Sequence, residues 1–116
     1  MRRSEDFRRT VRSGVRIGRP TLVLHAAPAS GPDQVRVGFL VGKAVGNAVT
    51  RNRVRRRLRH LAATELAGTP GAVHIVVRAL PRAATAPSEL PIDLASAWPQ
   101  ALVRLGVRTP EPAGAP

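Results

Sequence analysis

The side chains that could carry out acid–base or metal-dependent chemistry are few and scattered along this sequence. Its seven carboxylates are Glu5, Asp6, Asp33, Glu65, Glu89, Asp93 and Glu111. An enzyme that cleaves phosphodiesters by itself usually needs clustered carboxylates to hold metal ions, or a histidine and an acid to move protons. Glu5 and Asp6 are the only adjacent pair, and the first turn of a helix capped by Ser4 explains them. The sequence therefore predicts neither a catalytic residue nor a metal site.

The histidines and the glycine-rich turn provide no catalytic motif either. His25, His60 and His74 repeat no metal-ligand spacing, so we interpret them as surface or strand residues. The segment GFLVGKAVG is similar to a phosphate-binding loop, but three residues rather than four separate its first two glycines. Ala44 also stands where that loop needs Ser or Thr. Cysteine is absent, which excludes disulfides and thiolate chemistry. Binding is the chemistry that remains.

Net positive charge is the strongest feature of the composition, and it is confined to one half of the chain. Residues 1–60 hold fifteen of the nineteen basic residues and three acidic ones, a net charge of +12, whereas residues 61–116 are neutral overall. This asymmetry indicates a surface that faces a polyanion, with nucleic acid as the first candidate. Because the chain has only two phenylalanines and one tryptophan, it is not typical of proteins that bind single strands by stacking many bases.

The basic residues are densest in GNAVTRNRVRRRLRH, from Gly46 to His60, where six arginines fall within nine positions. Val54, Leu58 and Leu61 lie among and just after them at helical spacing. At 100° per residue these apolar side chains form one stripe, which would pack against a core and fix the direction of the cations. A solvated charge run on the protein surface is the alternative interpretation.

Periodicity predicts a single α+β domain over residues 1–108, followed by a disordered tail rich in Pro and Ala over 109–116. We expect a short helix over residues 4–13. Strands are predicted over 16–28 and 33–42, joined as a hairpin by the turn-rich segment PASGPD. Apolar residues alternate in both of these strands, which indicates a half-buried sheet.

The second half of the chain completes the expected order of elements. The periodicity predicts a helix over 47–66, a strand over 72–80 and a last helix capped by Ser88. Pro91 is acceptable in the first turn of that helix, but Pro99 predicts a kink or a break. The order indicates an α+β sandwich in which helices pack on one small mixed sheet.

The run VRVGFLVGKAVGNAVTRNRVRRRLRH, residues 35–60, resembles the signature of the bacterial ribonuclease P protein family. The Gly-Lys turn at 42–43, the GNAV motif and the RNR motif with its further basic residues carry the resemblance. Agreement in spacing extends it to about residues 3–106. The resemblance implies a four-stranded mixed sheet, three helices and a left-handed β-α-β crossover through the basic helix. That handedness departs from the rule that such crossovers are right-handed in about 98% of cases.

The resemblance also implies a function. In that family a large RNA hydrolyses precursor tRNA and releases its 5′ leader, with Mg²⁺ as a cofactor of the RNA subunit. This chain would be the non-catalytic, cytoplasmic protein subunit, which binds the catalytic RNA and precursor tRNA, with no membrane and no obligate protein partner. One alternative is a general or ribosomal RNA-binding protein without a role in tRNA processing. A nuclease that acts without RNA is another.

Two RNA-binding surfaces follow from the resemblance. The residues matched on the basic helix and the turn before it are Lys43, Asn47, Arg51, Asn52, Arg53, Arg55, Arg56 and Arg59. A cleft between the first helix and the sheet would receive the single-stranded leader, and its residues are Phe7, Val11, His25 and Arg78. Val11 and His25 stand where many family members carry aromatic residues, so stacking on the leader should be weaker. Phe7 could instead be a core residue that packs on Val11 one turn away.

Overall fold

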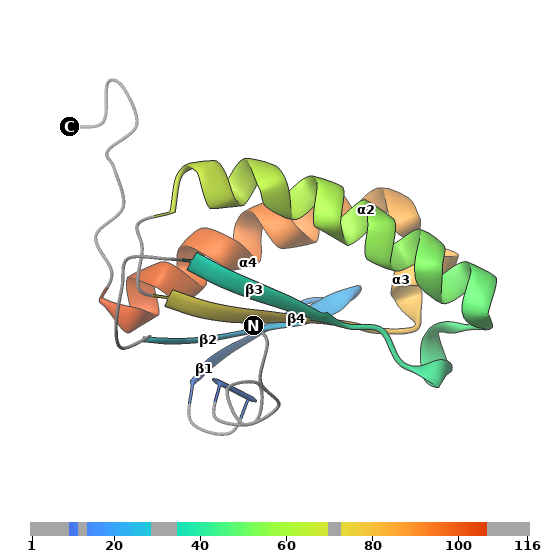
Figure 1. Ribbon diagram of the computed structural model, residues 1–116, viewed down its shortest axis with the longest axis horizontal. Coiled ribbons are helices and arrows are strands. Elements are labelled where there is room, and N and C mark those ends of the chain that lie inside the picture. Colours follow the sequence, from blue (N-terminus) through green and yellow to red (C-terminus); the bar gives the residue numbers. More distant parts are fainter. Residues whose placement is uncertain (1–9, 12–13, 29–34, 70–72, 107–116) are drawn as a thin grey trace.

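A computed structural model of the chain describes residues 10–11, 14–28, 35–69 and 73–106 (Figure 1). In these ranges the strands are β1 (Val15–Gly18), β2 (Leu22–Pro28), β3 (Val35–Leu40) and β4 (Val73–Ala79). The α-helices are α2 (Ala48–Ala67), α3 (Arg82–Thr85) and α4 (Leu90–Leu105). Two 3-10 helices, η1 (Lys43–Val45) and η2 (Pro87–Glu89), connect them. Thr10 and Val11 are helical too.

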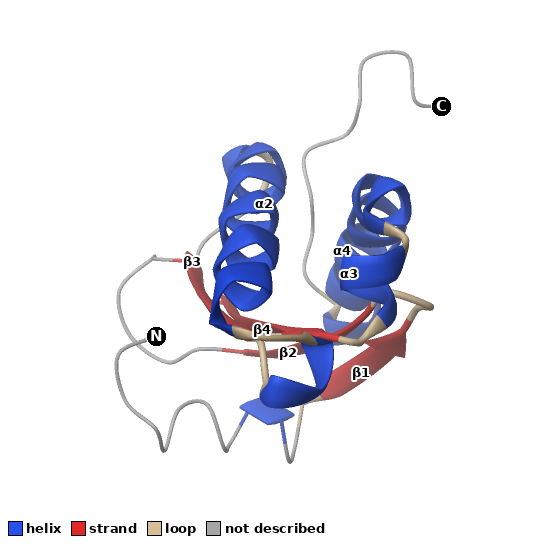
Figure 2. Ribbon diagram, turned by 90° about the vertical axis from the view of Figure 1, so that its right-hand side faces the viewer, coloured by secondary structure: helices blue, strands red, loops and turns tan. Residues whose placement is uncertain are grey.

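The four strands form one mixed sheet in the order β1-β2-β4-β3. β2 is antiparallel to β1 and to β4, whereas β3 and β4 are parallel. In Figure 2 the strands β3 and β4 point toward the viewer, and the chain passes clockwise from β3 through α2, above the sheet, to β4. The β3-α2-β4 crossover is therefore left-handed, as the family resemblance implied and against the usual preference.

The expected hairpin between segments 16–28 and 33–42 is wrong. β4 lies between β2 and β3, and the hairpin is formed instead within the first segment, by β1 and β2. The Arg19 N–H donates to the carbonyl of Leu22 across this turn, at 2.8 Å. Pro20 has no N–H to donate to a strand ladder, which explains why the first segment divides into two strands.

The two central strands are buried on both faces, which corrects the expectation of a half-buried sheet. Residues 22–27 of β2 are all buried, as are residues 73–77 of β4. Helices α2 and α4 cover one face, and the helical residues 10–11 lie on the other, which we call the outer face (Figure 2). The run VHIVV in β4, apolar at every position except His74, is typical of a strand buried on both sides.

The hydrophobic core lies between the sheet and the two long helices. The two long helices contribute Val54, Leu58 and Ala62 from α2, and Leu90, Leu94, Ala97, Trp98, Ala101 and Leu102 from α4. Leu61, also in the predicted stripe, is half-buried against this core. The indole Nε1 of Trp98 donates to Thr69 Oγ1 at 2.8 Å, so the largest core side chain has a partner for its polar atom.

The last helix departs from expectation at its start and at Pro99. Ser88 lies in η2, and α4 begins at Leu90 without a side-chain cap, so the predicted cap is wrong. The helix is also not broken at Pro99. Proline removes the donor for the carbonyl of Ala95, but both residues lie on the exposed side of α4. Water can donate a hydrogen bond to that carbonyl at the exposed surface, so the lost bond costs little. The helix therefore continues through Pro99, held by the core contacts of its buried side.

Some expectations fall outside the described ranges. Two predicted elements lie outside them: most of the first helix, including Phe7, and the tail over 109–116. Among the helices that are described, none combines the length and the apolar character needed to cross a membrane.

Candidate nucleic-acid interface

Two residues of the GNAV motif fix the start of α2. Asn47 is the N-cap, and its Oδ1 accepts a hydrogen bond from the N–H of Thr50 at 2.9 Å. Gly46, just before it, has a φ of 156°, a backbone region open almost only to glycine. A Cβ at this position would lie 2.8 Å from Cγ2 of Thr50. The motif therefore determines where the helix begins and where its arginines point.

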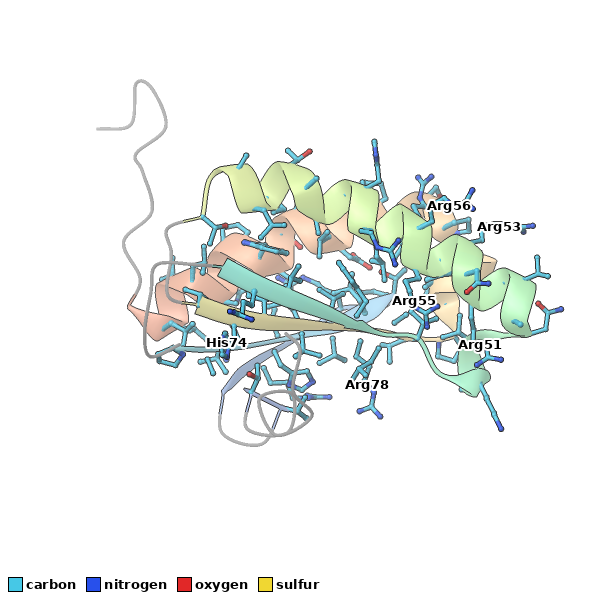
Figure 3. The ribbon with its side chains drawn as sticks, viewed as in Figure 1. Arg51, Arg53, Arg55, Arg56, His74 and Arg78 are labelled. Carbon is cyan, nitrogen blue, oxygen red and sulfur yellow. The ribbon has the colours of Figure 1, made fainter. Side chains whose placement is uncertain are left out.

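The predicted division of α2 into an apolar stripe and a cationic face is confirmed. Val54, Leu58 and Ala62 are buried. Between residues 51 and 60 the exposed side chains are Asn52, Arg53, Arg56, Arg57, Arg59 and His60. Arg51 and Arg55 are half-buried at the border of the stripe. Figure 3 shows Arg53 and Arg56 directed away from the sheet, whereas Arg51 and Arg55 lie near the end of β3.

Within the described ranges, no carboxylate forms an ion pair with an arginine of α2. The described acids are Glu65, Glu89 and Asp93. Glu89 is paired with Arg82, whose Nη2 lies 2.6 Å from its Oε2. Asp93 is buried and accepts hydrogen bonds from the backbone N–H and the hydroxyl of Thr21, at 3.1 and 2.6 Å. The charges of α2 are therefore available to an external polyanion.

The charges near the two ends of α2 do not match the helix dipole, which favours acids in the first turn and bases in the last. Its first turn contains Arg51 and no acid, and its last turn contains no basic residue. A cation at the N-terminus faces the positive end of the helix dipole, which costs about 0.3–1 kcal/mol at exposed sites. Because a bound phosphate would offset this cost, the arrangement favours anion binding.

An open groove of about 590 Å³ lies where β3 and β4 end. We call it the junction groove, and it is lined by residues 39–45, by Arg55 of α2 and by residues 78–81. Lys43 and Arg55 belong to the first predicted surface, and Arg78 belongs to the second. The junction groove therefore brings the two predicted surfaces together.

A smaller hollow of about 240 Å³ lies on the other flank of α2, against α3 and η2. Arg53 and Arg57 both line it. Arg57 was not among the predicted RNA-binding residues. The arginines thus extend around α2 from the junction groove on one flank to this hollow on the other.

The leader-cleft residues that are described lie in different environments. Val11 is half-buried and Arg78 is exposed. His25 is 4% exposed, and neither of its ring nitrogens has a hydrogen-bond partner among the described residues. Burial, followed by the charges of Arg16 and Arg78, lowers the pKa of His25, so its imidazole is neutral at pH 7. Arg16 is directly opposite His25 in the β1–β2 register. Sequence reasoning missed Arg16 because it did not separate β1 from β2.

In the parts of the chain that the structure describes, no three His, Asp or Glu side chains are close enough together to hold a metal ion. The groups that gather at the interface are cations and amides.

Fold and site together define a class: a small α+β protein whose left-handed crossover helix exposes arginines that have no carboxylate partner among the described residues. The family model Ribonuclease P matches residues 1–101. The ribonuclease P protein component of Kocuria rhizophila is 52% identical over 105 residues, covering 90% of this chain and 92% of that protein. That of Corynebacterium diphtheriae is 53% identical over 95 residues, covering 74% and 77%.

Solved structures show the same fold. The RNase P protein of Staphylococcus aureus has a TM-score of 0.78 at 24% identity, covering 87% of this chain and 93% of that one. The RNase P protein of Thermotoga maritima has a TM-score of 0.64 at 23% identity, covering 90% and 92%. The chain therefore belongs to the ribonuclease P protein family, and the resemblance carried by residues 35–60 is confirmed.

Proposed function

We propose that this chain is the protein subunit of ribonuclease P, which binds the catalytic RNA and the 5′ leader of precursor tRNA and so promotes endonucleolytic removal of the leader. The observation that carries the proposal is the arginine face of α2, which has no carboxylate partner among the residues that the structure describes, in a member of this family. The cytoplasm, where tRNA is processed in bacteria, is the proposed location.

The residue types indicate separate roles for the RNA and the protein. The RNA would supply the chemistry with magnesium ions that it holds, and no residue of this chain is assigned to the metal. The protein would supply positive charge at fixed positions. Arginines of α2 that contact phosphates position an RNA without reading its sequence. Their charge would also reduce repulsion between the catalytic RNA and its substrate, which otherwise requires more counterions.

Binding measurements separate this function from the first alternative. The complex of protein and catalytic RNA should bind precursor tRNA more tightly than mature tRNA, because only the precursor offers a leader to the protein. A general RNA-binding protein would strengthen the binding of both forms equally. Equal affinities for the two forms in the presence of the protein would contradict the proposal.

Incubation of the protein alone tests the second alternative. Purified free of RNA, the protein should not cleave precursor tRNA at any magnesium concentration. Cleavage that follows the protein through purification, and that survives prior digestion of contaminating RNA, would identify a nuclease that acts by itself.

A further inference from the structure

We propose that the smaller hollow, between α2 and the α3–η2 segment, binds a terminal phosphate monoester, the group that a mononucleotide or the 5′ end of an RNA strand carries. We call it the flank hollow, and Figure 1 shows α3 beside the N-terminal half of α2, where it lies. Its lining residues are Thr50, Arg53, Val54 and Arg57 from α2, and Ala83, Ala84, Pro87 and Leu90 from the facing segment. The site lies outside the junction groove, and its ligand is one that the proposed function does not require.

Two cations of the flank hollow can reach the same ligand atom. Arg53 and Arg57 are four residues apart on α2, so their side chains are neighbours on one side of the helix. Both are exposed, and none of the described residues that line the hollow is acidic. Like charges at this spacing destabilise a helix. A dianion between the two guanidinium groups would relieve that repulsion and accept charge-assisted hydrogen bonds from both.

Glu89, which precedes the lining residue Leu90, does not compete for these two arginines. Its Oε1 and Oε2 accept hydrogen bonds from Nε and Nη2 of Arg82, at 2.7 and 2.6 Å. This bidentate pairing satisfies the carboxylate within its own segment. The lining of the flank hollow therefore keeps a net positive charge.

The size of the flank hollow favours the end of a ligand over a whole molecule. Its volume of about 240 Å³ is below the roughly 300–1,000 Å³ typical of sites that enclose a small ligand. A phosphate would lie between the arginines, within reach of the Thr50 hydroxyl, which can donate a further hydrogen bond. Ala84 and Pro87 offer apolar surface to the ribose. Because none of the described lining residues is aromatic, we expect no stacking on the base.

Charge distinguishes a terminal phosphate from the phosphates inside an RNA strand. A monoester carries about −1.5 to −2 at pH 7, because its second pKa is about 6. A phosphodiester carries a single negative charge. Two guanidinium groups therefore match the monoester, whereas a phosphodiester would leave one of them without a full counter-charge.

Two short single-stranded RNAs of one sequence, one with a 5′-phosphate and one with a 5′-hydroxyl, test the RNA end as ligand. Each carries a fluorescent label at its 3′ end, and anisotropy measures its affinity for the full chain. The phosphorylated strand should bind roughly tenfold more tightly, as expected for charge-assisted hydrogen bonds that only this strand makes. Calorimetry with adenosine 5′-monophosphate, and with adenosine as the control, tests a free mononucleotide as ligand.

The two probes distinguish the sources of the phosphate. A preference for the phosphorylated strand without binding of the mononucleotide would assign the site to an RNA end. Binding of the mononucleotide without a preference between the strands would assign it to a free nucleotide. Equal affinities for the two strands, together with no binding of the mononucleotide, would overturn the proposal.

A matched pair of variants locates the binding in the flank hollow. Arg57→Ala should remove most of the discrimination between phosphorylated and unphosphorylated probes. Arg56→Ala removes the same charge from the neighbouring exposed position, but Arg56 does not line the hollow, so this variant should keep the discrimination. Circular dichroism should show that both variants are folded. Discrimination that survives in Arg57→Ala, or that is lost equally in both variants, would overturn the assignment to this hollow.

Discussion

Nη1 of Arg55 donates a hydrogen bond of 3.1 Å to Oδ1 of Asn52, one turn earlier on α2. Arg55 also lines the junction groove, whereas Asn52 does not. The amide therefore holds the guanidinium in one orientation before any RNA binds, which reduces the entropy lost on binding. We therefore expect Asn52, within the RNR motif, to act as a positioning residue for a cation outside the motif.

The first prediction concerns this pair. Asn52→Ala should weaken RNA binding, but adding it to Arg55→Ala should cause little further loss, because the amide would have no guanidinium left to orient. Affinity for the single-stranded RNA, measured for both single variants and the double variant, gives the coupling. Independent effects would show that Asn52 contacts RNA directly and does not act through Arg55.

The second prediction separates two roles of Asn47, which caps α2 and was also predicted to bind RNA. Asn47→Ala should lower the free energy of unfolding by about 0.5–2 kcal/mol, because the N–H of Thr50 loses its acceptor. Asn47→Asp keeps the cap, so it should preserve stability in urea unfolding. If Asn47 also contacts a phosphate, the added carboxylate of Asn47→Asp should weaken RNA binding. Wild-type affinity of Asn47→Asp would confine Asn47 to its capping role.

The third prediction tests the backbone of the turn before α2. Gly46→Ala should destabilise the protein by about 1–3 kcal/mol, because alanine would have to adopt a φ near 156° with its Cβ against Thr50. Gly42→Ala is the matched control, since its backbone and surroundings accept a Cβ, and it should be neutral or slightly stabilising. Urea unfolding measures both. Equal stabilities would mean that the turn can rearrange at no cost.

The fourth prediction concerns pH. His25 has a lower pKa in the folded protein than its usual value of 6.5, because burial and the charges of Arg16 and Arg78 disfavour its protonation. The unfolded chain therefore binds this proton more readily, and the free energy of unfolding should fall as the pH decreases through and below about 6.5. His25→Leu should reduce this slope between pH 7.5 and 5.5. If the variant shows the wild-type slope, groups other than His25 determine how stability depends on pH.

Local features of α2 were predictable because they depend on neighbours in the sequence. Asn47 stands where a cap is needed, and the apolar positions at helical spacing locate the buried stripe. The cationic face follows from the same periodicity. By contrast, the partners of the strands depend on contacts between distant segments. No local pattern indicated that β4 would lie between β2 and β3, or that the crossover would be left-handed.

The same distinction applies to the site. The outward direction of most arginines of α2 was predictable, since a helix preserves spacing, whereas Arg51 and Arg55 lie half-buried at the border of the apolar stripe. The proximity of Arg78 to Arg55 and the position of Arg16 opposite His25 arise only when the sheet is assembled. The two RNA surfaces were therefore predicted as separate, and only the folded chain brings them together at the junction groove.

Cleavage of precursor tRNA by a bacterial ribonuclease P RNA, with and without this protein at low and high magnesium, tests the central claim most directly. The protein should stimulate leader removal strongly at low magnesium and weakly at high magnesium, because its fixed cations replace part of the counterion requirement. An inactive RNA mixed with the protein is the control, and it should leave the precursor intact. No stimulation at either magnesium concentration would contradict the account.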